Sequence, residues 1–201
     1  MLTENRDKIV AEVLILAQSC DYEKEHSHQV TKLALKIFDE LKSLHGLGEK
    51  ERLWLECGAL LHDIGWISGR QGHHKKSLEL IMGVKNLSFS EREKIMVGLI
   101  ARYHRKALPQ AGHKFFDDLT PEEKEVIRKS ASFLRIADGL DRRHVSSVED
   151  LSCEISPDTV IVRIKSKNFS DMEQSTAKEK ADLFEQVFQK SLIIEWEKEK
   201  G

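Results

Sequence analysis

The chain has 201 residues, of which 40% are hydrophobic and 33% charged, and its formal net charge is −2. This length suits one compact domain, or one domain with a small appendage, and the hydrophobic share is enough for a core. A near-neutral charge argues against a protein built mainly for nucleic acid or anionic membranes, because such proteins usually need a basic stripe.

The three cysteines are odd in number and far apart, and no CxxC pair occurs. We therefore expect reduced thiols rather than a disulfide framework or a zinc knuckle. The N-terminus lacks the apolar core of a signal peptide, and no run approaches membrane-spanning length, so we expect a cytoplasmic protein.

Apolar residues at helical spacing predict five helices in the first half of the chain, over residues 3–20, 22–44, 49–64, 73–82 and 90–103. Residues 106–119 contain Pro109 and Gly112 and are expected to form a loop. The run Thr120-Pro121-Glu122-Glu123 has a cap residue, an early proline and acids at the positive end of the helix dipole. It therefore starts a helix that continues to about residue 140.

The pattern changes after this helix. Residues 151–155, 159–164 and 192–196 are strand-like, the second of them strongly β-branched, and a helix is expected over 175–189. We therefore predict a mostly α protein with a helical domain over residues 1–144 and a small α+β appendage over residues 145–201.

The sharpest chemical feature is His62-Asp63, at the apolar end of the predicted third helix. An imidazole beside a carboxylate is costly in a buried setting unless a metal ion compensates both groups. Two adjacent residues cannot enclose an ion, so other helices must supply ligands, and His26 and Asp138 fit by their apolar flanks. A lone histidine-aspartate pair is more often structural, but the ordered set of four favours a metal site.

The order H…HD…D, with HDIG at residues 62–65, resembles the HD superfamily of metal-dependent phosphohydrolases. The runs ARYHRKALP (101–109), LRIADGLDR (134–142) and KADLFEQVF (180–188) resemble the exopolyphosphatase/guanosine pentaphosphate phosphatase family, specifically its C-terminal HD-like region. The resemblance covers about residues 20–196 and implies an HD-domain helical bundle with metal ligands at His26, His62, Asp63 and Asp138. The family's actin-like domains, which carry its phosphatase chemistry, have no counterpart in these residues.

Further histidines are candidates for a second ion. His73 and His104 lie near the places where histidines complete the second ion in two-metal HD proteins, and Asp63 would then bridge the ions. Arg105 stands where two-metal members often have another histidine, so one ion is expected and a second is left open.

Basic residues near the predicted ligands favour a phosphorylated ligand, because guanidinium groups clamp phosphate through paired hydrogen bonds. The candidates for substrate binding are Arg102, Arg105, Lys106 and Arg142. We assign catalytic roles to Asp63, His104 and Arg105. Four further polar residues receive no such role. Asp141 could support a metal ligand from outside the ion's own ligands, but it is interpreted mainly as a helix-end charge, and His45, His113 and His144 are expected to be solvent-exposed.

The leading hypothesis is a metal-dependent phosphohydrolase that acts on a nucleotide or polyphosphate and uses Mn, Mg, Co, Fe, Ni or Zn. Two alternatives stay open: a regulatory module that binds such a ligand without turnover, and a dimerisation scaffold. We expect a small phosphorylated ligand as partner, with no nucleic acid polymer and no membrane. A homodimer also stays open.

Overall fold

The computed structural model describes residues 2–197, which form mainly helices and one three-stranded sheet near the C-terminus. The helices are α1 (Leu2–Ser19), α2 (Lys24–Glu40), α3 (Lys42–His45), α4 (Glu49–Leu60), η1 (a 3-10 helix, Ile64–Ser68), α5 (His73–Gly83), α6 (Glu91–Arg102), α7 (Pro121–Leu140), α8 (Asp171–Glu179) and α9 (Asp182–Phe188). The strands are β1 (Val148–Ile155), β2 (Thr159–Ser166) and β3 (Ser191–Trp196). The predicted mostly α fold with a small α+β appendage is confirmed.

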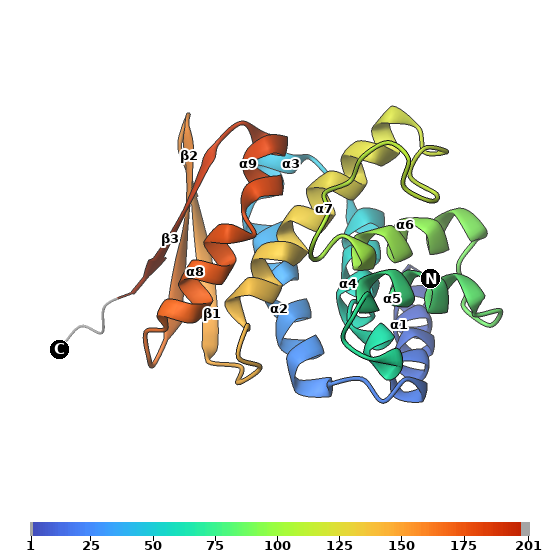
Figure 1. The fold of residues 1–201 in the computed structure, drawn as a ribbon. Helices are drawn as coiled ribbons and strands as arrows, with labels where there is room; N and C mark the ends of the chain where they lie inside the picture. The colour runs from blue at the N-terminus through green and yellow to red at the C-terminus, as the bar shows by residue number, and fades with distance from the viewer. Residues whose placement is uncertain (1, 198–201) are drawn as a thin grey trace.

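Helices α2 and α7 form the middle of the molecule, between the sheet at one end and α1, α5 and α6 at the other (Figure 1). Buried residues on α2 recur at Val30, Leu33, Ala34 and Ile37, the spacing of one helix face. This face packs against α4 and α7. Among residues 2–197, no helix is both long enough and apolar enough to span a membrane.

Three predicted helices differ from the structure: two are divided and one ends early. The predicted helix 22–44 is divided at Leu41 into α2 and α3, and 175–189 is divided into α8 and α9. The third helix ends at Leu60, so His62 and Asp63 lie in a turn rather than on a helix. The Ser77 hydroxyl donates to the carbonyl oxygen of His62 at 2.7 Å, and this tertiary contact supports a turn that no local pattern predicts.

Gly65 lets this turn lie directly on the first part of α5. A Cβ atom at residue 65 would come 2.1 Å from the carbonyl oxygen of His73 and 2.7 Å from the backbone nitrogen of Ser77. The Gly65 N–H donates to the Ser77 hydroxyl at 3.0 Å. The absence of a side chain therefore brings the His62-Asp63 turn and the start of α5 into direct contact.

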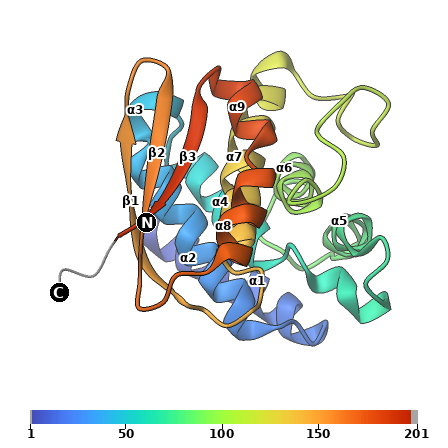
Figure 2. The ribbon, with the colours of Figure 1, turned by 60° about the vertical axis from the view of Figure 1, so that its left-hand side comes forward.

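The sheet has the order β1-β2-β3, with β1 antiparallel and β3 parallel to β2. A parallel pair needs a crossover, which α8 and α9 provide, and these helices run alongside α7 (Figure 2). Alternate residues of β2 (Val160, Val162 and Ile164) are fully buried and belong to the same continuous core as the helices.

Candidate metal centre

Five separate segments bring six histidine and aspartate side chains to one buried place. His26 lies in the first turn of α2, His62 and Asp63 in the turn after α4, and Asp138 in the last turn of α7. His73 begins α5 and His104 follows α6, so all six predicted ligands meet. None of the four histidines is more than 1% exposed.

The first group contains His26, His62 and Asp138, whose ligand atoms lie within 4.8 Å of one another. Nε2 of His26 is 3.5 Å from Oδ1 of Asp138, and Nε2 of His62 is 4.0 Å from the same oxygen. Oδ2 of Asp63 lies 3.5 Å from Nε2 of His62 and 4.0 Å from Nε2 of His26. Two imidazoles and two carboxylate oxygens thus converge, a donor set that suits a divalent transition metal.

The second group contains Asp63, His73 and His104. Oδ1 of Asp63 is 3.0 Å from Nε2 of His73 and 3.4 Å from Nε2 of His104, and the two nitrogens are 3.3 Å apart. Asp63 therefore presents one carboxylate oxygen to each group, as a carboxylate that bridges two ions would.

Backbone and side-chain acceptors fix the same tautomer in all four histidines. The Nδ1–H groups of His62, His73 and His104 donate to the carbonyl oxygens of Ala59, Arg70 and Ala101 at 2.7, 2.8 and 2.7 Å. The Nδ1–H of His26 donates instead to Oδ2 of Asp141 at 2.8 Å. Each Nε2 is thereby turned to the centre, and such outer partners also raise the basicity of a ligating imidazole.

Several atoms at the centre fit a cation better than a hydrogen-bond network. Nε2 of His26, Nε2 of His62 and Oδ1 of Asp63 are buried without a hydrogen-bond partner among the described residues. The Nδ1 of His73 carries the proton that bonds to Arg70, so its Nε2 is an acceptor. This nitrogen lies 3.0 Å from Oδ1 of Asp63, which is also an acceptor, and no proton lies between the two atoms. Buried polar atoms without partners are costly, and divalent ions would satisfy them, so the residues fit a metal site.

The charges of the metal-free centre follow from burial and from close ion pairs. Burial lowers the pKa of His62 and holds that of His104 well below its usual range. Burial would raise the pKa of Asp63, but the neighbouring histidines outweigh it and lower the pKa. For His26, burial lowers the pKa, but the nearby carboxylates of Asp138 and Asp141 raise it to about 9, so an ion must displace a proton there.

Two residues of the centre were missed or misread in the sequence. Lys180, just after α8, donates from its ammonium group to Oδ2 of Asp138. Burial would raise the pKa of Asp138, but the charge of Lys180 and the neighbouring histidines outweigh burial and hold this pKa well below its usual range. No sequence signal links Lys180 with a site 42 residues earlier. Interpreting Asp141 mainly as a helix-end charge was wrong, because it is 1% exposed and accepts from His26.

All three histidines expected in solvent lie against other rings, and His113 is half-buried and stacks on Tyr103 with ring centroids 5.7 Å apart. His144 is half-buried and stacks on His26 with ring centroids 3.7 Å apart, and its Nδ1 is 2.7 Å from a carboxylate oxygen of Glu23. His45 is buried, and its Nε2–H donates to the carbonyl oxygen of Phe38 at 2.7 Å. Position near a loop misled the prediction: His45 ends α3, and His144 lies in a loop that folds back onto α2.

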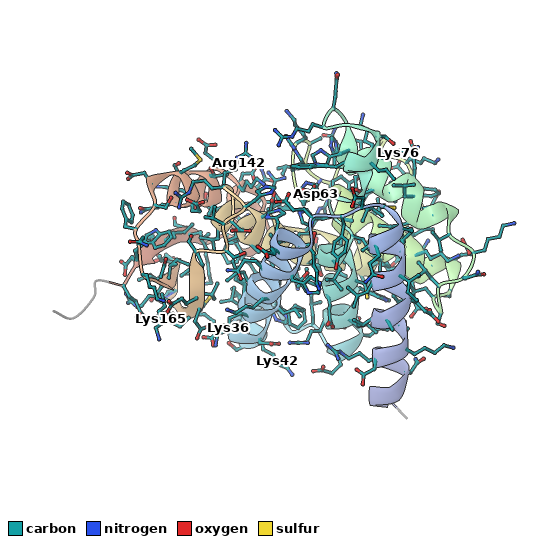
Figure 3. The ribbon with its side chains drawn as sticks, turned by 90° about the horizontal axis from the view of Figure 1, so that it is seen from below. Lys36, Lys42, Asp63, Lys76, Arg142 and Lys165 are labelled. Carbon is teal, nitrogen blue, oxygen red and sulfur yellow. The ribbon has the colours of Figure 1, made fainter. Side chains whose placement is uncertain are left out.

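The four basic residues that were expected to bind substrate do not lie together: one is at the metal centre, one lines a cavity beside it, and two are exposed. Arg105 lies at the centre, where its Nη1 donates to Nε2 of His73 at 3.4 Å. Arg102 instead lines a neighbouring cavity. Lys106 and Arg142 are exposed and, in the described part of the chain, make no side-chain hydrogen bond or ion pair. In Figure 3, Arg142 lies on the sheet side of Asp63.

The fold and the site define a helical domain with a buried histidine-aspartate centre that could hold divalent ions. The family described as Ppx/GppA phosphatase, domain III, matches residues 10–193. The chain therefore belongs to the Ppx/GppA phosphatase domain III family, and the resemblance inferred from the motifs around His104, Asp138 and Lys180 is confirmed.

Proposed function

We propose that the protein is a metal-dependent phosphohydrolase that acts on a phosphorylated small molecule, either a nucleotide or a polyphosphate. The observation that carries this proposal is the position of Asp63, with one carboxylate oxygen toward each of two ligand groups. A purely structural histidine-aspartate pair would not need six converging ligand atoms, four of them on buried imidazoles. Membership of a phosphatase-related family supports the same reaction class.

The residues of the two groups would hold two divalent ions. His26, His62 and Asp138 would bind the first ion, His73 and His104 the second, and Asp63 both. Bound ions of this kind lower the pKa of water and withdraw charge from phosphoryl oxygens. The mixed nitrogen and oxygen ligands suit Mn, Fe, Co, Ni or Zn, and Mg is the hard-ion alternative.

The protein's own side chains would orient the phosphate and shield the ligands. Arg105 brings a guanidinium group to His73, and Lys180 brings an ammonium group to Asp138, so two cations flank the centre. Both would offset charge on phosphate oxygens. The ring of His144 lies between His26 and Trp66, with centroids 3.7 and 5.7 Å away, and would exclude water from that side.

The first test is phosphate release from a panel of nucleotides and polyphosphates with added Mn²⁺, Co²⁺, Mg²⁺ or Ni²⁺. We expect metal-dependent turnover that Asp63→Asn lowers by more than about a hundredfold, because loss of an outer partner of a ligand already costs about 10- to 100-fold. Asp158→Asn, in the exposed β1–β2 turn, is the matched control. Equal turnover by wild type and Asp63→Asn would contradict the proposal.

One observation favours a second candidate, a regulatory module that binds a nucleotide or polyphosphate without hydrolysis. Lys180 already engages Asp138, and a carboxylate paired with an ammonium group is a weaker metal ligand. Such a module would bind phosphorylated ligands with micromolar affinity but release no phosphate with any metal of the panel. Calorimetric titration on the same samples distinguishes the two functions. In either case we propose a cytoplasmic protein with a small-molecule partner.

A further inference from the structure

A second cavity lies beside the metal centre, between α5, the end of α6 and the loop that follows α6. Its volume is about 680 Å³, within the range of sites for drug-sized ligands. Figure 2 shows α5 and α6 nearly end-on, side by side, with this loop above them. None of the six candidate metal ligands lines the cavity, so it is a separate site.

Three basic side chains line this cavity: Lys75, Arg102 and Lys114. None of the three makes a side-chain hydrogen bond or an ion pair in the described part of the chain, whereas the one lining carboxylate, Glu79, pairs with Lys76 at 3.2 Å. Burial, and then the charges of Arg102 and Lys75, hold the pKa of His113 below its ordinary value. These two charges therefore act on the same wall, where their effect on His113 exceeds the opposing effect of Asp117, and the cavity lining carries a net positive charge.

Apolar side chains form another part of the wall. Leu78 is 2% exposed, and Met82 and Phe115 are half-buried at the cavity. Phe115 has φ +67°, in the left-handed region that bulky residues rarely adopt. Strain of this kind persists where the surroundings hold it and is concentrated at ligand sites. In this protein, the strained backbone places the aromatic ring of Phe115 at the basic cavity.

The cavity and the metal centre share a wall. His73 belongs to the metal centre, and the next residue, His74, lines the cavity. In the same way, His104 belongs to the metal centre, and the preceding residue, Tyr103, lines the cavity. The Tyr103 hydroxyl is 2.9 Å from Nδ1 of His113, which fixes the far side of the cavity against this wall. A molecule in the cavity would thus contact the residues next to two candidate metal ligands, His73 and His104, in the chain.

We propose that this cavity binds a nucleoside phosphate, with its base against Leu78, Met82 and Phe115 and its phosphate at Arg102, Lys75 and Lys114. Charge complementarity requires an anion, and the apolar wall requires a ligand with a flat apolar part. Inorganic polyphosphate matches only the charge, because it would leave the apolar wall without a partner. The proposal goes beyond hydrolysis at the metal centre and holds whether or not that centre turns over substrate.

The test is calorimetric titration of the full chain with AMP, GMP, CMP and UMP, in EDTA so that no ion holds phosphate at the metal centre. We expect at least one nucleotide to bind, and Arg102→Ala to weaken its binding at least tenfold. Lys75→Ala and Lys114→Ala should weaken it by smaller factors. Lys85→Ala removes an exposed charge just beyond α5 that does not line the cavity, and it should leave the affinity unchanged.

The matched comparisons separate this proposal from the proposed function. Asp63→Asn should lower hydrolysis by more than about a hundredfold but keep nucleotide binding in EDTA. Tripolyphosphate should bind at least tenfold more weakly than the best nucleotide. The proposal is overturned if no nucleotide binds at millimolar concentration, if Arg102→Ala binds as well as wild type, or if tripolyphosphate binds as well as the nucleotides.

Discussion

Among single residues, Asp141 is not one of the six candidate ligands, yet it holds a histidine of the candidate metal centre in place. It is buried, and its Oδ2 accepts the Nδ1–H of His26 while its Oδ1 accepts the backbone N–H of Ser146 at 2.7 Å. The carboxylate therefore fixes the ring of His26 and the loop that carries His144. Its charge also makes Nε2 of His26 a better donor to a cation.

We expect Asp141→Asn to weaken Mn²⁺ binding about 10- to 100-fold, the usual cost of losing an outer-shell carboxylate. The amide keeps the size of the side chain, so the thermal midpoint should change little. Calorimetric titration with Mn²⁺ measures the effect. Arg142→Ala, at the exposed neighbouring position, is the control. Unchanged affinity in Asp141→Asn would mean that Asp141 only shapes the loop.

At the scale of one element, the start of α7 joins a capping box to an ion pair. Thr120 accepts the backbone N–H of Glu123 at 3.3 Å, and Glu123 accepts the N–H of Thr120 at 2.8 Å. Arg92 of α6 donates from Nε to the same carboxylate at 2.7 Å. The hydrogen bond from Arg92 is the main cause that lowers the pKa of Glu123 from 4.5 to about 2.

A depressed folded-state pKa means that the unfolded chain binds the proton more tightly. The contribution of Glu123 to stability is therefore complete above pH 4.5 and is lost as the pH falls from there towards 2. We expect Glu123→Gln to lower the free energy of unfolding by about 1 kcal/mol at pH 7, allowing for solvent screening. The difference should vanish near pH 2 in urea titrations. Glu125→Gln is the control, because this carboxylate is exposed and, within residues 2–197, pairs with Arg128 alone.

For the whole molecule, the contact between α7 and α8 holds the C-terminal segment onto the helices. A Cβ atom at Gly139 would come 2.5 Å from Cα and 2.8 Å from the backbone nitrogen of Ala177. This close approach also brings Lys180, at the end of α8, to Asp138. One missing side chain thus lets the C-terminal segment reach the metal centre.

We expect Gly139→Ala to lower the free energy of unfolding by about 1–3 kcal/mol, because the overpacking cost exceeds the gain of about 1 kcal/mol in helix propensity. Urea unfolding followed by circular dichroism measures this change, and because the core is continuous we expect one transition. Gly83→Ala adds a Cβ with no atom within 4 Å, so it should not destabilise. Equal effects of the two substitutions would contradict this account.

Several features were determined by the sequence itself, because they depend on neighbours in the chain. The apolar period of α2 and the cap of α7 predict helices directly, and the β-branched run of β2 predicts a strand. The candidate ligand set was also predictable, and the structure brings these residues together, since buried histidines and aspartates with apolar flanks are costly without a cation. Family motifs around His104 and Asp138 then led to the family that the comparison confirms.

Other features were decided only by the tertiary structure. The turn that carries His62 and Asp63 depends on Ser77, and the roles of Asp141 and His144 depend on a loop that folds back onto α2. Lys180 reaches Asp138 only because Gly139 lets α8 approach α7. Each of these contacts joins residues far apart in the chain. Local propensity carries no information about such contacts, because they form only when the burial of the common core brings the segments together.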